Sequence, residues 1–347
     1  MPALAVADAL RDSGADPFFI GTADRAEAEL VPAAGYELEF LHVRGLDRRN
    51  PVRAAGAARL AAAAVPAARR VLRDRGAEAV LGGGGYVAGP AGLAALSLRL
   101  PLVLTEADRH LGLTNRVLAR RARRVCLAFP IAGRDGDPYV VTGRPVPEAV
   151  LRADRGAARS QLGLADEDRC LLVFGGSQGA RSINLCALDA FAGAAAADRD
   201  FHVLHISGRR DYPAALERLG GARRYTLLAY EPDLGDALAA SDLVLARAGG
   251  SIFEIAAAGR PSILVPYPYA AARHQHANAE WMGEAGAAVV VEDSELDPAR
   301  LRGLAGELLA DDERLREMAA AARARARPDA ARRIAAEVLA AIREAPG

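Results

Sequence analysis

The sequence predicts an α/β fold made of two Rossmann-like domains, each built around a parallel sheet. Short apolar, β-prone runs alternate with alanine- and arginine-rich helical stretches along the 347 residues, and this alternation implies parallel strands joined by right-handed crossovers. A Pro/Gly-rich passage at 133–147 interrupts the rhythm, which restarts after it. A chain of this length exceeds one ordinary core. We therefore expect domains at 1–147 and 148–327, with ligands at the carboxyl ends of the strands, in a cleft between facing sheets.

The first domain is expected to open with a helix, because Leu4, Ala7 and Leu10 form an apolar stripe and Pro2 is placed like a first-turn residue. Pro66 is expected to break or kink a later helix. The predicted helices that follow are Ala23–Leu30, Ala54–Arg73 and Leu113–Arg121. The predicted strands are Pro17–Ile20, Glu37–Leu41, Ala79–Leu81, Leu102–Leu104 and Tyr139–Thr142.

The second domain repeats the pattern and ends in a helical tail. Its predicted strands are Cys170–Phe174, Phe201–Ile206, Tyr225–Ala229, Leu243–Ala246, Ser262–Val265 and Ala288–Val291. From Pro298 the sequence is helical, and Pro328 should break it before a last helix that ends near Glu344. We treat 328–347 as a segment of its own.

The composition excludes several classes of protein. Hydrophobic residues make up 51% of the chain, which excludes disorder as the main state. No apolar run approaches the ~20 residues that span a bilayer, and the first residues show no basic secretory leader. The net charge of +0 gives no support to nucleic-acid binding. The separated cysteines Cys126, Cys170 and Cys186 indicate reduced core thiols of a cytosolic protein.

A first candidate site is the turn Gly175–Gly179, which reads G-G-S-Q-G between the run Cys170–Phe174 and a helix-compatible segment. A strand–Gly turn–helix unit directs free N–H groups and the positive end of a helix dipole at one spot, as phosphate binding requires. Ser177 and Gln178 add hydrogen-bonding groups there. The spacing matches neither a dinucleotide fingerprint nor a Walker loop, and a tight turn without a ligand is the alternative.

A second turn of the same kind is Ala248–Ser251, followed by Glu254. Glu254 lies one helical turn beyond Ser251, so its carboxylate can accept hydrogen bonds from both hydroxyls of a ribose while the N–H groups of the turn at Gly249 and Gly250 bind phosphate. The same residues fit the S-x-x-E capping box, and both interpretations stay open. Two adjacent anion-binding turns suggest a nucleotide diphosphate.

Two further segments carry polar groups. Arg273–Asn278 follows a predicted strand and could contact sugar hydroxyls, or be a solvated loop. Its histidines lack the H-E-x-x-H spacing and any cysteine partner, so we predict no metal site.

Four glycines at 82–85 also follow a predicted strand. Thr105–Asp108 ends the next predicted strand, where catalytic carboxylates often lie. Ordinary surface acids are the alternative for the latter.

Six motifs along the chain resemble those of one known family. They are P-A-L-A-V-A at Pro2–Ala7, I-G-T-A-D-R at Ile20–Arg25, G-G-Y-V-A-G-P at Gly84–Pro90, G-L-T-N at Gly112–Asn115, G-G-S-Q-G-A-R at Gly175–Arg181 and E-I-A-A-A-G at Glu254–Gly259. The family is that of the UDP-N-acetylglucosamine–lipid I N-acetylglucosaminyltransferases of peptidoglycan synthesis (MurG). The resemblance implies the two-domain GT-B fold, with the final helix, 328–347, crossing back to the N-terminal domain.

The resemblance also implies roles for single residues, with donor binding in 148–327 and the acceptor on the side of 1–147. Glu254 would hold the ribose, Gln275 the sugar with His274 adjacent, and the loop at Tyr230–Glu231 would meet uracil through its backbone. The implied phosphate ligands are Ser177, Gln178, Gly249, Gly250 and Ser251.

The chain departs from the family pattern on the acceptor side. The family's first strand and its loop ending in G-G-T-G-G-H are not found before Pro2–Ala7, so we expect the first domain to lack them. Thr105–Asp108 stands where the family has H-E-Q-N, and only Glu106 is kept. Pro147 replaces an expected arginine, for which Arg144 could substitute. Glu106 is the candidate general base, His110 is a second candidate, and Asp108 is a candidate acceptor ligand.

The implied reaction moves N-acetylglucosamine, with inversion, from its UDP donor to the C4 hydroxyl of the lipid-linked muramyl sugar. No cofactor is implied. The lipid acceptor implies docking at the cytoplasmic face of the inner membrane, for which Arg53–Arg75 and Arg116–Arg124 are candidates; ordinary solvated faces are the alternative. Three other functions stay open: a GT-B transferase with another acceptor, a UDP-sugar 2-epimerase, and a non-catalytic UDP-sugar-binding protein.

Overall fold

The computed structural model describes residues 2–44, 51–176, 179–193, 199–231, 234–270 and 273–345. The chain divides into two compact units. Unit 1 comprises Met1–Pro145 together with Asp329–Gly347, and unit 2 comprises Val146–Pro328. The sequence placed the corresponding boundaries at 147/148 and 327/328.

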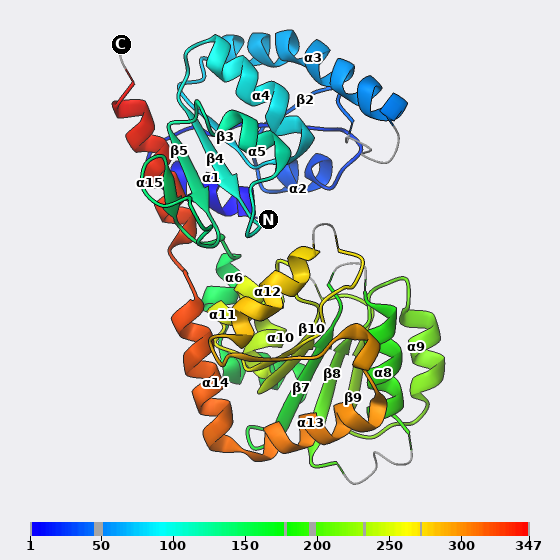
Figure 1. Cartoon of the computed structure of the whole chain (residues 1–347). Coiled ribbons are helices and arrows are strands. Elements are labelled where there is room, and N and C mark those ends of the chain that lie inside the picture. Colours follow the sequence, from blue (N-terminus) through cyan, green and yellow to red (C-terminus); the bar gives the residue numbers. More distant parts are fainter. Residues whose placement is uncertain are drawn as a thin grey trace. The chain divides into compact units, whose positions relative to one another are not determined.

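Unit 2 contains a six-stranded parallel sheet in the order β12-β11-β10-β7-β8-β9 (Figure 1). Its strands are β7 (Arg169–Phe174), β8 (Phe201–Ile206), β9 (Tyr225–Leu228), β10 (Leu243–Ala246), β11 (Ser262–Leu264) and β12 (Ala288–Val290). Its helices are α6 (Glu148–Arg152), α7 (Arg155–Leu162), α8 (Arg181–Phe191), α9 (Tyr212–Leu219), α10 (Leu234–Ala240), α11 (Ile252–Ala257), α12 (His274–Gly283), α13 (Pro298–Ala310) and α14 (Asp312–Arg325).

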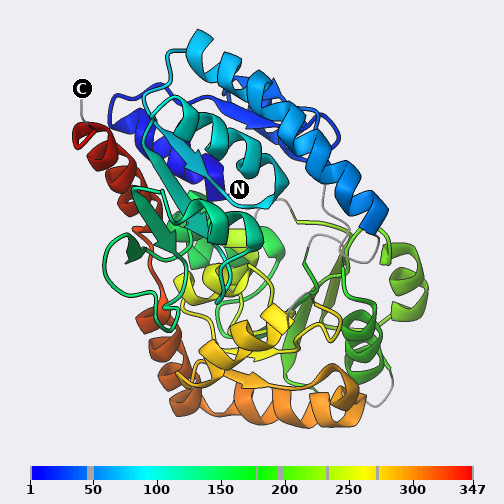
Figure 2. The same ribbon diagram turned by 45° about the horizontal axis from the view of Figure 1, so that its top comes forward.

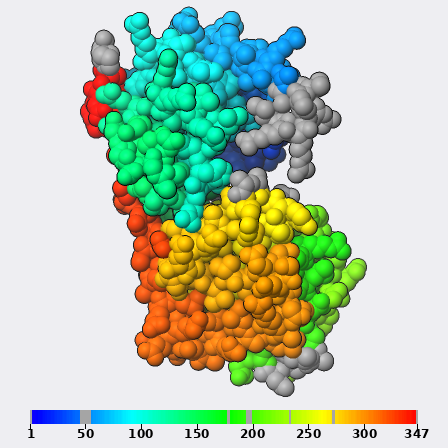
Figure 3. Space-filling model, viewed as in Figure 1, coloured from blue at the N-terminus to red at the C-terminus, as the bar shows by residue number. Residues whose placement is uncertain are grey.

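Both faces of this sheet are buried, which explains why its central strands read as continuous apolar runs. Leu171 and Val173 face a core that includes residues of α8 and α13, such as Phe191 and Leu308. The alternate residues of β7, such as Leu172, are equally buried, and α10 contacts this strand. In the space-filling view the orange segment that contains α13 forms part of the outer surface of this unit on the face shown (Figure 3).

Unit 1 contains a four-stranded parallel sheet, β3-β4-β5-β6, and a separate parallel pair, β1-β2. The strands are β1 (Phe19–Gly21), β2 (Leu38–Phe40), β3 (Val80–Gly82), β4 (Leu102–Glu106), β5 (Arg124–Leu127) and β6 (Tyr139–Val141). The helices are α1 (Pro2–Asp12), α2 (Glu27–Ala33), α3 (Pro51–Asp74), α4 (Gly85–Ser97), α5 (Leu113–Leu118) and α15 (Ala330–Arg343).

The two faces of the four-stranded sheet are covered by different parts of the chain. On one face, residues of α3, α4 and α5 pack against Leu104 and Val125, and α3 and α4 run beside each other (Figure 2). On the other face, Val103 and Cys126 pack against α1 and against Ile334 of α15. The last helix of the chain therefore supplies part of the core of unit 1.

Each strand that the sequence predicts is present within a residue or two of its expected bounds. The strand β5 at Arg124–Leu127 was not predicted. The expected break at Pro66 does not occur. The helix α3 continues through this proline to Asp74. Ala64, Ala68 and Leu72 form a buried stripe on both sides of the proline, and this packing compensates for the lost backbone hydrogen bond.

Candidate functional site

The predicted donor residues gather at the switch point of the sheet in unit 2. From β7 the chain goes to β8 and β9 on one side, and then returns to β10 on the other side of β7. Phe174 at the end of β7 pairs with Ala246 at the end of β10. The two glycine-rich turns begin at the very next residues, Gly175 and Arg247. Ligands of open α/β sheets bind at such a point, outside the carboxyl ends of the strands.

The first turn, after β7, is held by close backbone contacts. A Cβ atom on Gly175 would lie 2.3 Å from the backbone nitrogen of Ala180, and one on Gly179 would lie 2.3 Å from the Ser207 carbonyl oxygen. Gly179 also has a φ of +74°, which favours glycine. The fold itself therefore requires glycine at both positions. The predicted phosphate ligands Ser177 and Gln178 lie outside the described residues.

The start of α8 is tied to its neighbours by Arg247, a residue that sequence reasoning did not single out. The Arg247 side chain is largely buried and donates to the Ser182 hydroxyl at 2.6 Å. It also donates to the carbonyl oxygens of Val265 and Pro266, both at 3.2 Å, in the loop after β11. The arginine in the segment R-A-G-G was the only signal of this network in the sequence.

The second turn, Ala248–Ser251, leads into α11. Ser251 occupies the N-cap position but has helical φ and ψ, and its side chain makes no capping hydrogen bond. The capping-box alternative therefore lacks its serine contact. Glu254 lies in the first turn of α11 and is half-buried, so it remains suited to a ligand at the carboxyl end of β10.

The helix α12 brings two amides to this second turn. The Oε1 atom of Gln275 accepts a hydrogen bond from the Tyr267 N–H at 2.9 Å, and its Nε2 atom lies 3.8 Å from where a Cβ of Gly249 would be. The buried Asn278 side chain donates to the Ala248 carbonyl at 2.9 Å. Asn278 lies in the predicted polar segment Arg273–Asn278, but no role of its own was assigned to it. The predicted sugar ligand Gln275 is thus beside the predicted phosphate turn, and His274 precedes it at the start of α12.

Tyr230 and Glu231 follow β9 at the same edge of the sheet. The side chain of Tyr230 is 44% exposed, and the Arg209 guanidinium lies 4.5 Å from the centre of its ring. An aromatic ring and an arginine beside the strand ends provide flat surfaces on which a base can stack.

A buried polar chain supports α8 from the side of β8 and β9. The His205 Nε2 lies 3.0 Å from the Asn184 Oδ1, and its Nδ1 lies 2.7 Å from the Tyr225 hydroxyl. Since Oδ1 can only accept, Nε2 carries the proton. Burial lowers the pKa of His205 to about 4, so the imidazole is neutral near pH 7. Asn184 in turn donates to the Ser207 carbonyl at 2.8 Å, beside the first turn.

In unit 1, Glu106 ends β4 and is 8% exposed. Its Oε1 atom accepts from the backbone N–H groups of Ala107 at 3.1 Å and of Asp108 at 3.3 Å. Its Oε2 atom accepts from the Gly112 N–H at 2.8 Å and from the Asn115 amide at 2.9 Å. Four donors therefore surround the carboxylate of the predicted general base.

The other predicted residues of unit 1 are more accessible. His110 is exposed, and Asp108 and Arg144 are half-buried. Asp108 and His110 lie on the loop between β4 and α5, whereas Arg144 follows β6. In the ranges that the structure describes, no group of three or more metal-ligating side chains occurs.

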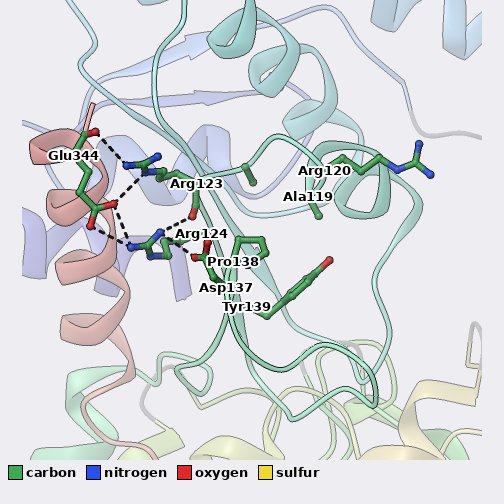
Figure 4. A pocket seen from close by; sticks show the side chains of 9 residues that line it. Ala119, Arg120, Arg123, Arg124, Asp137, Pro138, Tyr139 and Glu344 are labelled. Carbon is green, nitrogen blue, oxygen red and sulfur yellow. Dashed lines mark hydrogen bonds and ion pairs between the residues drawn. The ribbon is translucent and has the colours of Figure 1, made fainter. Parts of the chain in front are cut away.

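A recess in unit 1 lies at the opposite end of its sheet. It measures about 640 Å³ and is lined by Arg120, Arg123 and Arg124, among others (Figure 4). Arg123 and Arg124 pair with Glu344 at 3.1 and 3.2 Å, so their charges are compensated. Because β5 and β6 begin here, this recess is remote from the ligand-binding edge of a parallel sheet. We assign it to the attachment of α15.

Comparison with known proteins gives matches along nearly the whole chain. The model of the glycosyltransferase family 28 N-terminal domain matches residues 1–127, and that of the family 28 C-terminal domain matches residues 170–334. The UDP-N-acetylglucosamine–N-acetylmuramyl-(pentapeptide) pyrophosphoryl-undecaprenol N-acetylglucosamine transferase of Moorella thermoacetica is 42% identical over 345 residues, which is 95% of this chain and 92% of that protein. The protein of the same name from Rubrobacter xylanophilus is 41% identical, over 99% of this chain and all of its own length.

A solved structure matches as well. The crystal structure of MurG from Acinetobacter baumannii superimposes with a TM-score of 0.78 at 29% identity, and the match covers 98% of this chain and 95% of that one. The predicted fold class, a two-domain α/β protein of the GT-B type with parallel sheets, is thereby confirmed. The cleft expected between the domains stays a prediction.

Proposed function

Because the chain belongs to glycosyltransferase family 28, and within it to the UDP-N-acetylglucosamine–N-acetylmuramyl-(pentapeptide) pyrophosphoryl-undecaprenol N-acetylglucosamine transferases, we propose that it transfers N-acetylglucosamine from UDP-N-acetylglucosamine to the C4 hydroxyl of the muramyl sugar of lipid I. The product is lipid II, the disaccharide precursor of peptidoglycan. One observation carries the proposal: both glycine turns, Glu254 and Gln275 lie at the switch point of the sheet in unit 2.

We assign each part of the donor to one feature of that edge. The N–H groups of the two turns and the start of α8 bind the diphosphate, with Ser177, Gln178, Gly249, Gly250 and Ser251 as the candidate ligands. Glu254 accepts the ribose hydroxyls, and Gln275 with His274 contacts the sugar. The uracil contacts the backbone at Tyr230–Glu231.

The reaction is an in-line displacement with inversion. The C4 oxygen of the acceptor attacks C1 of N-acetylglucosamine as the bond from C1 to the UDP oxygen breaks, and a general base takes the hydroxyl proton. The positive end of α8 and the N–H groups of the turns offset the charge that develops on UDP. We place proton transfer at the carboxyl end of β4, where Glu106 ends the strand and Asp108 and His110 lie on the loop after it, and we assign Arg144 to the acceptor side.

The acceptor's lipid requires the enzyme to work at a membrane surface, and we propose the cytoplasmic face of the inner membrane. In the ranges that the structure describes, no helix is both long and apolar enough to cross a membrane. The helices α3, α4 and α5 pack side by side in unit 1 and expose large apolar residues: Leu60 is 39%, Leu93 47%, Leu113 47% and Val117 59% exposed. Arg116 on α5 and Arg120 just after it are exposed as well, which suits anionic lipid.

The proposal is tested with the purified full chain, UDP-N-acetylglucosamine carrying a labelled sugar, and a short-chain lipid I analogue. We expect label to appear in a disaccharide-linked lipid. Free sugar and UDP, formed without acceptor, would instead identify a 2-epimerase-type reaction. If the protein binds UDP but does not transfer sugar to the lipid I analogue, two possibilities remain: a transferase with another acceptor, or a non-catalytic protein. Assays with a panel of hydroxyl acceptors would distinguish them.

A further inference from the structure

We propose that Glu106 is a positioning residue of the transfer reaction, and that its carboxylate fixes the loop Ala107–Gly112 instead of taking the acceptor's proton. The inference rests on the proposed function, since it assigns a part in that reaction. It replaces the role of general base that the family resemblance suggested for Glu106.

The geometry of the carboxylate argues against proton uptake. An ionised carboxylate offers about four lone-pair directions, and each Glu106 oxygen already accepts two hydrogen bonds, from 2.8 to 3.3 Å. Three of the donors are backbone N–H groups, which cannot turn away. A proton on either oxygen would face one of these N–H groups and displace an existing bond. A substrate hydroxyl also has little access to this carboxylate, because Glu106 is only 8% exposed.

The same contacts form a closed frame. Starting from the end of β4, the chain passes through Ala107 and Asp108, whose N–H groups donate to Oε1, and returns at Gly112, whose N–H donates to Oε2. Gly112 is the N-cap residue of α5. The carboxylate thus holds both ends of the loop and satisfies an N–H group at the start of the helix, as an N-terminal acid does.

Asn115 is the second element of the frame. It is 2% exposed, and its Nδ2 donates to the Glu106 carboxylate and to the Thr105 carbonyl, both at 2.9 Å. One amide group therefore joins the first turn of α5 to the last residues of β4. Neighbouring contacts extend to the turn after β3: the Thr114 hydroxyl donates to the Gly85 carbonyl at 3.0 Å. A change at Glu106 would be transmitted to both turns at this edge of the sheet.

The loop that Glu106 fixes carries the remaining ionisable candidates. Asp108 is half-buried and His110 is exposed. Neither side chain has a hydrogen-bond or ion-pair partner in the ranges that the structure describes. They are thus available to a substrate in a way that Glu106 is not. Glu106 acts on the reaction through the placement of these two groups.

Steady-state kinetics of Glu106→Gln, Asn115→Ala and the double variant test the inference. In Glu106→Gln, an NH₂ group replaces one of the two oxygens and faces the two donors that this oxygen accepted from, so the loop shifts while the side chain keeps its size. We expect kcat/KM for the acceptor to fall about 10- to 100-fold and the KM for UDP-N-acetylglucosamine to stay within about twofold. The acidic limb of the pH–rate profile should remain. Asn115→Ala should reproduce these effects, and the double variant should be little worse than either single one.

Hydrogen exchange of the substrate-free protein gives a readout that does not depend on activity. We expect the amides of residues 107–116 to exchange faster in Glu106→Gln than in the wild type, with unit 2 unchanged. Glu78→Gln, an exposed carboxylate just before β3, is the matched control and should alter neither exchange nor kinetics.

The outcomes separate the inference from the proposed function. Loss of the acidic limb in Glu106→Gln, together with wild-type exchange in the loop, would overturn the positioning role and make Glu106 the base. If the wild type transfers no sugar to the lipid I analogue, the proposed function fails. In that case faster exchange of the loop in Glu106→Gln would still support the structural part of the inference, and unchanged exchange would refute it.

Discussion

Arg247 and Asp293 form an ion pair of 2.6 Å that joins the end of β10 to the 3₁₀ turn Asp293–Glu295 after β12. The Ser182 hydroxyl donates to the same Asp293 carboxylate at 2.8 Å and accepts from the Arg247 guanidinium at 2.6 Å. Three segments that are far apart in the sequence are thereby fixed at the edge where the donor residues gather.

Asp293→Asn should destabilise unit 2, because it leaves the largely buried Arg247 guanidinium without its counter-charge. We expect a loss of about 1–3 kcal/mol in the free energy of unfolding, measured with urea. Asp189→Asn is the control: its partner Arg218 is 50% exposed, so this surface pair should contribute about 0–1 kcal/mol. Equal losses of unfolding free energy in the two variants would show that the largely buried pair of Arg247 and Asp293 stabilises the protein no more than an exposed pair does.

Glu254→Ala should weaken UDP binding, because it removes a charge-assisted contact to the ribose hydroxyls. The expected loss is about 1.5–3 kcal/mol in binding free energy, measured by calorimetry. Since Ser251 makes no capping hydrogen bond, Ser251→Ala should leave the melting temperature unchanged. Wild-type UDP affinity in Glu254→Ala would contradict the ribose role.

His205 should make the stability of unit 2 depend on pH. Its pKa is lowered by burial to about 4 in the folded protein and is about 6.5 when unfolded. The unfolded state therefore binds more protons between pH 6.5 and 4, and stability is lost as the pH falls through this window, by about 3 kcal/mol in total. Unfolding experiments across this pH window should show that the free energy of unfolding changes less steeply with pH in His205→Gln than in the wild type. An equal slope would exclude His205 as its source.

The three cysteines should resist thiol reagents while the protein is folded. All are buried, and burial raises the pKa of Cys126, Cys170 and Cys186 to about 12, so almost no thiolate is present near pH 8. We expect labelling by a maleimide only at denaturant concentrations that unfold the chain, followed by mass spectrometry of each site. Rapid labelling of one cysteine in buffer would reveal local opening around it.

Val117→Asp should reduce binding to vesicles that contain anionic lipid, because Val117 is 59% exposed on α5 beside exposed arginines. Sedimentation with phosphatidylglycerol vesicles measures the effect, and raised salt should weaken binding of the wild type. Leu216→Asp is the matched control, since Leu216 is 50% exposed on α9 of unit 2. Similar losses for both variants would argue against a docking face on α3, α4 and α5.

Local sequence patterns predicted most of the fold, because each strand is a short apolar run between helical stretches. They missed β5, whose four residues Arg124–Leu127 follow an arginine-rich helical segment and begin with an arginine. They also allowed a break at Pro66 that does not occur, because a lost hydrogen bond is visible in the sequence whereas the packing of Ala64 and Ala68 against α4 is not.

The candidate site was predicted where its signal is local and missed where it is not. The turns at Gly175 and Ala248 are contiguous motifs and could be recognised as such. Arg247 with Asp293, and Glu106 with Asn115, meet only after loops have closed, so neither pair has a sequence spacing that would reveal it. Glu106 shows the consequence: its position at a strand end suggested catalysis, but its four donors were beyond the reach of the sequence.

The helix α15 has a consequence for the order in which the protein matures on the ribosome. Ile334, Ala335 and Val338 cover the face of unit 1 that carries Val103 and Cys126, and they are synthesised some two hundred residues after it. Until they emerge, this face is covered by α1 and lacks the part of its cover that α15 supplies, whereas unit 2 ends at Pro328 and is already fully translated. The part of the chain made first is therefore the last to complete its core, and it has the longest exposure to chaperones.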